Sequence, residues 1–176
     1  KIFRRGLTVL GGAFVIWIAT RLFLTESLIV HGVLTLIGVA MLLTIPLKKV
    51  FSKIPPLIGF FACLLIFIFT YDVELGKLGF GSLFSLNLPL WLYKNNFTAL
   101  FGFAPITFYS TDYVPILPWI FSYWMGFFLF KLFEKRDWLK YLSKPKIPPL
   151  EWLGRHSLII YMIHQPIIYG LLYLIF

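Results

Sequence analysis

Residues 54–71 read IPPLIGFFACLLIFIFTY, an apolar stretch without a single charged side chain. A run of this length and composition is typical of a helix that crosses the hydrocarbon core of a bilayer, which is about 30 Å thick. The whole chain has the same character, because only 13% of its residues are charged, whereas soluble domains contain about 25%. The sequence therefore predicts an integral membrane protein of the all-α class, built as a polytopic transmembrane helix bundle.

Four further apolar segments accompany this run. The expected spans are residues 7–24, 27–47, 54–71, 114–133 and 152–176, and the second is expected to end at Pro46. Between the third and fourth spans, two apolar pieces at residues 78–92 and 97–109 are too short to cross a bilayer and contain glycine and proline. We therefore expect about five spanning helices plus short interfacial or re-entrant helices, in a single transmembrane domain covering residues 1–176.

The basic residues are divided unequally between the two sides of this arrangement. With the amino terminus in the cytoplasm, thirteen of the sixteen Lys and Arg residues are cytoplasmic, and Arg21, Lys77 and Lys94 are outside. Cytoplasmic loops of membrane proteins carry such an excess of positive charge. The net charge of +9 therefore indicates membrane topology and attraction to anionic lipids rather than a nucleic-acid partner. One cysteine, Cys63, allows neither a disulfide nor a cysteine metal site, and no metal is expected.

The last apolar segment carries a row of polar groups. Gly154, Ser157, Tyr161 and His164 are spaced at i, i+3, i+7 and i+10, which places them on one stripe of a single helix. Pro166 is expected to loosen the helix beside them, because it cannot donate a backbone hydrogen bond. Two interpretations stay open: the stripe is a site for chemistry or ligand contact, or His164 is a hydrogen-bonded link between helices.

Three longer motifs occur along the chain. They are RRG at residues 4–6 with HGVLTLIG at 31–38, STDYVPILPW at 110–119 with Gly126, and LGRHSLIIYMIHQP at 153–166. Together they resemble the heparan-alpha-glucosaminide N-acetyltransferase-like family of membrane acyltransferases, including its bacterial members. The resemblance covers nearly all of this chain and implies the carboxyl-terminal portion of a larger acyltransferase domain.

Two features depart from the family pattern. Family members usually begin with two earlier spans that carry an Asp-x-x-Arg-Gly motif and a histidine important for transfer, and neither precedes Lys1. We therefore expect that the chain is part of a longer protein and that this piece alone is inactive. Thr35 stands where the family's second-span motif usually has a histidine, so no role of that histidine is carried over.

The resemblance implies transfer of an acetyl group from cytoplasmic acetyl-CoA to an extracytoplasmic sugar amine or hydroxyl. The candidate catalytic residues are His164 as base and Tyr161 and Ser157 as donors to the oxyanion. The candidate acetyl-CoA contacts are Gly154, Arg155 and His156, together with the basic residues 131–146. The candidate acceptor contacts are Asp112, Tyr113 and Gln165. Ordinary cytoplasmic charge explains the lysines equally well, and helix capping explains Asp112 equally well.

A non-enzymatic membrane protein, either a transporter or permease subunit or a structural protein, is the alternative. Polar groups on broken helices near the bilayer midplane also mark transporters, but the sequence shows no internal repeat. The expected location is the bacterial inner membrane with the amino terminus in the cytoplasm. The expected partners are a sugar or glycan acceptor and membrane lipids, and a homodimer is compatible with the sequence.

The charge distribution generates a test of topology. Single cysteines placed in residues 72–94 of a Cys63-free background should react with a membrane-impermeant thiol reagent added outside, and cysteines in residues 135–146 should not. The measurement is labelling of intact cells beside permeabilised cells. The reverse pattern would overturn the orientation and every side assignment that depends on it.

Overall fold

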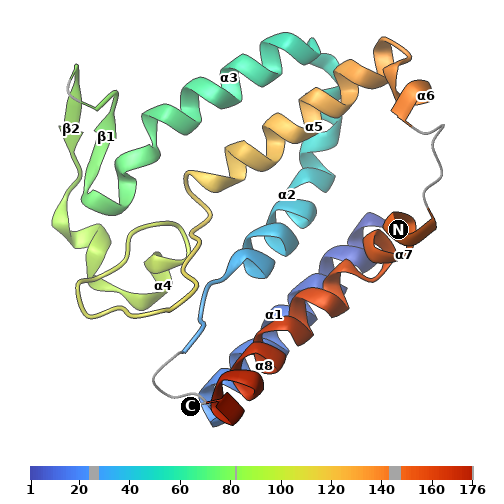
Figure 1. Ribbon diagram of the computed structural model, residues 1–176. Coiled ribbons are helices and arrows are strands. Elements are labelled where there is room, and N and C mark those ends of the chain that lie inside the picture. Colours follow the sequence, from blue (N-terminus) through green and yellow to red (C-terminus); the bar gives the residue numbers. More distant parts are fainter. Residues whose placement is uncertain (24–27, 82, 143–147, 176) are drawn as a thin grey trace. The chain divides into compact units, whose positions relative to one another are not determined.

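The computed structural model describes residues 1–23, 28–81, 83–142 and 148–175 (Figure 1). The chain forms two compact units, Lys1–Arg136 and Asp137–Phe176, and each is described by itself. The first unit contains α1 (Ile2–Phe23), α2 (Val33–Lys53), α3 (Pro56–Phe69), the 3-10 helix η2 (Tyr71–Leu75), β1 (Lys77–Gly79), β2 (Ser85–Asn87), the 3-10 helix η3 (Leu90–Lys94), α4 (Asn96–Ala99) and α5 (Trp119–Lys135). The second contains α6 (Trp138–Leu142), α7 (Pro148–Arg155) and α8 (Ser157–Ile175).

Three stretches among the described residues are long and apolar enough to cross a membrane. They are Ile2–Leu22, Val33–Lys53 and Pro56–Leu75, the last formed by α3 together with η2. Large apolar side chains such as Phe14, Phe61 and Leu65 are exposed on these helices, as expected of surfaces that face lipid. The chain is therefore a helical membrane protein, and the count of about five spans remains a prediction.

Several predicted helix limits are wrong. The second apolar segment becomes helical at Val33 rather than at residue 27, and α2 continues through Pro46 to Lys53. The fourth begins at Trp119 rather than at residue 114, because residues 114–118 contain two prolines and take an irregular course. The fifth is not one helix, because α7 ends at Arg155 and α8 begins at Ser157.

Small residues allow α1 and α2 to pack closely. A Cβ atom on Gly38 of α2 would lie 2.6 Å from Cγ of Leu10 on α1. A Cβ atom on Gly6 of α1 would lie 3.0 Å from Cδ2 of Leu42 on α2. Glycine at both positions therefore lets the two backbones approach each other, as is common between membrane helices.

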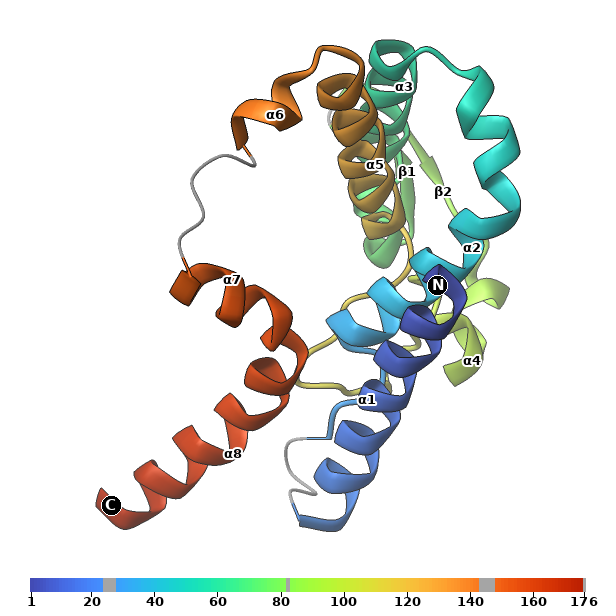
Figure 2. The same cartoon turned by 90° about the vertical axis from the view of Figure 1, so that its right-hand side faces the viewer.

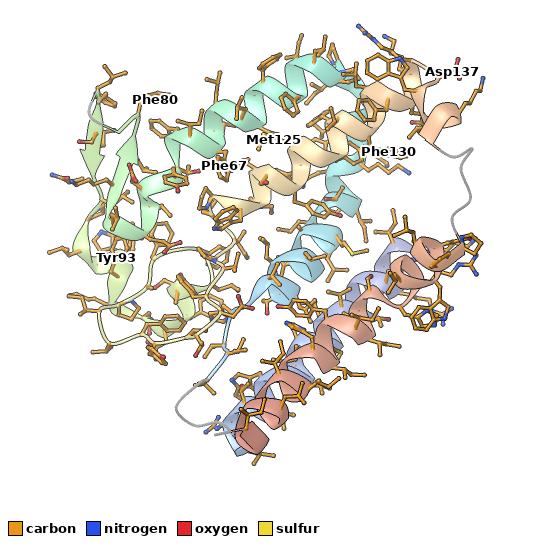
Figure 3. All side chains as sticks on the ribbon, viewed as in Figure 1. Phe67, Phe80, Tyr93, Met125, Phe130 and Asp137 are labelled. Atoms are coloured by element: carbon orange, nitrogen blue, oxygen red, sulfur yellow. The ribbon has the colours of Figure 1, made fainter. Side chains whose placement is uncertain are left out.

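Helix α5 packs against both α2 and α3, and Figures 1 and 2 both show α3 and α5 side by side. The ring of Phe128 on α5 is buried over Gly59 of α3, where an added Cβ atom would meet the ring at 2.3 Å. Phe51 of α2 completes this contact, with its ring centroid 5.2 Å from that of Phe128. Nearer the start of α5, Figure 3 shows Phe67 of α3 beside α5, and its ring centroid lies 5.6 Å from that of Trp119.

Two polar contacts fix α5 on α2. The indole N–H of Trp124 donates to Oγ1 of Thr44 at 3.0 Å, and that hydroxyl donates to the carbonyl oxygen of Ala40 at 2.6 Å. The ammonium group of Lys131 donates to three carbonyl oxygens at the end of α2, where helical partners are missing. These oxygens belong to Phe51, Ser52 and Ile54, at 2.9, 2.9 and 3.1 Å.

The segment between α3 and α5 is a folded loop region, and its described residues form no helix long enough to cross a bilayer. The two apolar pieces therefore do not form full-length helices, as predicted. The chain is mostly helical, and the antiparallel pair of β1 and β2 is an element that the sequence did not predict. Gly79 adopts φ +152°, and a Cβ atom there would lie 1.9 Å from the carbonyl oxygen of Phe84. Glycine therefore permits a hairpin where the apolar composition indicated a helical piece.

Buried side chains and hydrogen bonds hold the loop region together next to the start of α5. Val73 and Ala99 are fully buried, and Tyr93, labelled in Figure 3, donates its hydroxyl hydrogen to the carbonyl oxygen of Val73. The amide of Ile116 donates to the carbonyl oxygen of Leu100 at 2.8 Å. These contacts join the segment before α5 to the loops that follow α3.

The contact between Gly59 and Phe128 predicts a large effect of one methyl group. Gly59→Ala should lower the free energy of unfolding by about 1–3 kcal/mol, because the Cβ atom overlaps a buried ring. The measurement is thermal or denaturant unfolding in detergent. Gly126→Ala is the matched control on the facing helix, because no atom lies within 4 Å of an added Cβ atom there. Equal stability of the two variants would contradict the packing of α3 against α5.

Candidate functional site

Three of the predicted catalytic residues lie on one face of α8. Ser157, Tyr161 and His164 follow one another at i, i+4 and i+7 within this helix. Tyr161 and His164 are partly buried, whereas Ser157 is exposed. Gly154 belongs to α7, beyond the break at His156, so the prediction of one uninterrupted helical stripe is wrong.

The hydrogen bonding of His164 assigns its two ring nitrogens. Nδ1 lies within hydrogen-bond distance of the carbonyl oxygen of Tyr161. A carbonyl oxygen only accepts, so Nδ1 carries the hydrogen and Nε2 of the neutral ring carries the lone pair. The rings of Tyr161 and His164 are also adjacent, with centroids 5.2 Å apart. This arrangement presents a basic nitrogen beside a phenol on one helix, as general-base chemistry requires.

The residues at the junction of α7 and α8 are held by local contacts. Arg155 forms an ion pair with Glu151, one helical turn earlier, and both side chains are exposed. Nδ1 of His156 lies 2.9 Å from the carbonyl oxygen of Trp152, and the two rings are 4.7 Å apart. Because an exposed ion pair contributes little stability, Arg155 can exchange Glu151 for another anion at small cost.

The basic segment at residues 131–146 is only partly suited to phosphate binding. Lys131 is committed to the end of α2, and Lys140 pairs with Asp137 at 2.9 Å. Lys144 and Lys146 lie outside the described residues. The structure therefore assigns a packing role to one lysine that the sequence placed with the acetyl-CoA contacts.

In the first unit, Asp112 and Tyr113 lie in an irregular segment beside the connection before α2. The amide of Thr111 donates to the carbonyl oxygen of Leu28 at 3.0 Å, and the amide of Val114 donates to that of His31 at 2.8 Å. The amide of Val30 also donates to Oγ of Ser110, 80 positions along the chain, at 3.1 Å. These bonds hold the residues just before α2 against the segment around Asp112.

The carboxylate of Asp112 lies at the amino-terminal end of α2. A Cβ atom on Gly32, the residue that precedes the helix, would be 3.0 Å from Oδ2 of Asp112. Negative charge is stabilised at this end of a helix, because the first N–H groups have no intrahelical partner. One role of Asp112 is therefore to stabilise a helix. That helix is α2 and not α5, the next helix after Asp112 in the sequence.

Tyr113 is a hydrogen-bond donor inside the loop region. Its hydroxyl donates to the carbonyl oxygen of Ala99 at 2.5 Å. Burial raises the pKa of Tyr113 above its ordinary value, and the nearby Glu74 carboxylate and Tyr93 raise it further. The phenol therefore stays protonated and acts through its hydroxyl group.

His31, the first residue of the HGVLTLIG motif, lies in the same region. Its ring stacks on that of Phe108 with centroids 5.9 Å apart, and burial lowers its pKa below the ordinary value of 6.5. Phe108 is far from His31 in sequence, so no local spacing could reveal this contact. The described site residues thus form two groups: Ser157, Tyr161 and His164 in the second unit, and His31, Asp112 and Tyr113 in the first.

The remaining predictions concern one acceptor contact and the question of a metal site. Gln165 lies within α8, but its side chain is outside the part of the structure that is described. Across the described ranges, no group of three His, Cys, Asp or Glu residues is arranged to hold a metal ion.

Comparison with known proteins adds one finding. The family model described as "Heparan-alpha-glucosaminide N-acetyltransferase, catalytic" matches residues 1–166. The matched region includes both groups of candidate site residues and ends at Pro166. No curated protein and no solved structure gives a significant match.

The buried position of His31 predicts a pH dependence of stability. Because folding lowers its pKa, the unfolded chain binds more protons than the folded chain between that lowered value and 6.5. Stability should therefore fall as the pH decreases through this interval, and His31→Gln should reduce the fall. Thermal unfolding from about pH 8 to about pH 5 measures it, with His156→Gln as the matched control. An unchanged pH profile in His31→Gln would contradict the buried neutral ring.

Proposed function

The chain belongs to the heparan-alpha-glucosaminide N-acetyltransferase catalytic family, and from this premise we propose that it transfers an acetyl group across a membrane. The donor is cytoplasmic acetyl-CoA, and the acceptor is an extracytoplasmic sugar amine or hydroxyl. The observation that carries the proposal is the family match over residues 1–166. The polar face of α8 supports it, because it supplies the types of group that acyl transfer needs.

His164 is the general base of the proposed reaction. Its Nε2 accepts the proton that the acceptor amine or hydroxyl loses as it attacks the thioester carbonyl. The bond from Nδ1 to the Tyr161 carbonyl oxygen keeps the ring in the tautomer that this step needs. A positioned base of this kind contributes roughly 10²–10⁴ in rate.

Tyr161 and Ser157 stabilise the negative charge that develops on the carbonyl oxygen. Their hydroxyl groups lie on the same face of α8 as His164 and donate hydrogen bonds to that oxygen. Each such donor contributes about 10²–10³ in rate when it is held in place before reaction. When the carbonyl re-forms, the carbon–sulfur bond breaks and the acetyl group stays on the acceptor. The proton held on Nε2 of His164 passes to the sulfur, and coenzyme A leaves as the thiol.

The junction of α7 and α8 binds acetyl-CoA in this proposal. Arg155 is exposed and paired only with the neighbouring Glu151, so a phosphate group can replace that carboxylate as its partner. The paired rings of Trp152 and His156 offer an aromatic surface beside it. Gly154 has no side chain, and nothing lies within 4 Å of the position that a Cβ atom would take. The surface beside Arg155 is therefore open at this residue.

Asp112, Tyr113 and Gln165 contact the acceptor in this proposal. Tyr113 already donates its hydroxyl hydrogen to the carbonyl oxygen of Ala99. Its phenol oxygen can therefore only accept a hydrogen bond from the sugar substrate. Asp112 combines this role with its position at the start of α2. An amine or several hydroxyl groups on a sugar supply the donors that both residues need.

The topology is proposed with five spans and a cytoplasmic amino terminus in a bacterial inner membrane. Helix α5 has 17 residues and α8 has 19, which correspond to roughly 26 Å and 28 Å. Both lengths approach the thickness of a hydrocarbon core. The unequal distribution of Lys and Arg supports the orientation.

The central test is His164→Ala in the full-length protein. Turnover with acetyl-CoA and a glucosamine acceptor should fall by about a hundredfold or more, because the general base is lost. Thermal stability and acetyl-CoA binding should remain nearly unchanged. Tyr161→Phe should reduce turnover by a smaller factor, about tenfold or more, since one oxyanion donor is lost.

Ile163→Ala is the matched control, because Ile163 is an exposed apolar neighbour on the same helix. If His164 is instead a link between helices, His164→Ala should mainly reduce stability, by about 1 kcal/mol. Near-normal turnover of a well-folded His164→Ala protein would remove His164 from the mechanism. Absence of transfer by the wild-type protein with any sugar acceptor would favour the transporter or structural alternative.

A further inference from the structure

A concave pocket of about 390 Å³ lies where α2 ends, α3 begins and α5 ends. Its lining includes Lys53, Pro55, Pro56, Lys131, Glu134 and Lys135. All of these residues belong to the first unit.

The charges around this pocket are mainly positive. Three lysines and one glutamate line it. The ammonium group of Lys131 is already bonded to three carbonyl oxygens, so it fixes the pocket wall and adds charge without a spare hydrogen. Within the described ranges, Lys53 and Lys135 have no ion-pair partner, and both side chains are exposed.

The start of α3 adds polar hydrogen-bond donors to the same wall. Its amino-terminal end carries no side-chain cap and no acidic residue in the first turn. The N–H groups of Leu57 and Ile58 therefore have no helical carbonyl to bind. The partial positive charge at this end of the helix has the same sign as the two lysines.

We propose that this pocket binds the phosphate group of an anionic ligand between Lys53 and Lys135. A phosphate offers several acceptor oxygens, which match two ammonium groups and the first N–H groups of α3. Both a phospholipid headgroup and a soluble phosphate ester have this chemistry, and the experiment separates them. Lys135 belongs to the basic stretch 131–146 that the sequence also linked to acetyl-CoA, whereas Lys53 does not. The proposal does not rest on acetyl transfer, because its test measures binding alone.

The test measures binding to the full-length protein in neutral detergent. Native mass spectrometry gives the affinity of the first bound dioleoylphosphatidylglycerol beside that of dioleoylphosphatidylcholine, and calorimetry gives the affinity of adenosine 3′,5′-bisphosphate. Lys53→Gln/Lys135→Gln should weaken binding of the preferred probe by about fivefold for each lysine. Glu134→Gln should strengthen it by a similar factor, about fivefold, because a like charge is removed.

Lys77→Gln/Lys94→Gln is the matched control, because it removes the same charge from exposed lysines of β1 and η3. A selective loss of phosphatidylglycerol binding identifies a lipid headgroup, and a selective loss of bisphosphate binding identifies a soluble ester. Equal affinities in the wild-type protein, the pocket variant and the control would overturn the proposal. Thermal unfolding of each variant shows whether a change in binding arises from misfolding, and Glu134→Gln keeps the test valid if the double lysine variant is unstable.

Discussion

Helix α5 is held between α2 and α3 along its length, and the arrangement of the first unit depends on this contact. Phe128 covers Gly59 of α3 and meets Phe51 of α2, so one ring links three helices. Inside a bilayer the hydrophobic effect does not drive helices together, and close packing takes its place. Glycine under an aromatic ring provides such packing, and the Trp124–Thr44 hydrogen bond sets the register of α5 on α2.

The position of α5 also determines where the loop region sits. Residues 114–118 lead directly into α5, and the segment before them pairs with the connection that precedes α2. This pairing places Asp112 at the start of α2 and Tyr113 beside Ala99. Asp112 and Tyr113, two of the residues expected to meet the acceptor, are therefore positioned by backbone hydrogen bonds and not by a helix of their own.

The basic residues at the opposite end of these helices differ in what they do. Lys131 satisfies carbonyl oxygens at the end of α2, which would otherwise lack partners near the membrane. Lys53 and Lys135 line a pocket beside it and keep their charge available. A single topological rule accounts for all three lysines in the sequence, whereas in the structure only Lys131 bonds to the carbonyl oxygens at the end of α2.

The sequence by itself determined the membrane class, the family, and the grouping of Ser157, Tyr161 and His164. These properties depend on composition, on short-range spacing and on motif residues that are contiguous in the chain. Helix limits near Pro46 and Pro115 were predicted wrongly, because proline is tolerated in one context and ends a helix in another. The break at His156 was also missed, because no proline marks it. Only the tertiary structure decided four further features. These are the hairpin at Gly79, the contact of Asp112 with the start of α2, the stacking of His31 and the bonds of Lys131. Each of these features depends on a partner in another element or on a local backbone angle. Such partners and angles leave no periodic signal in the sequence.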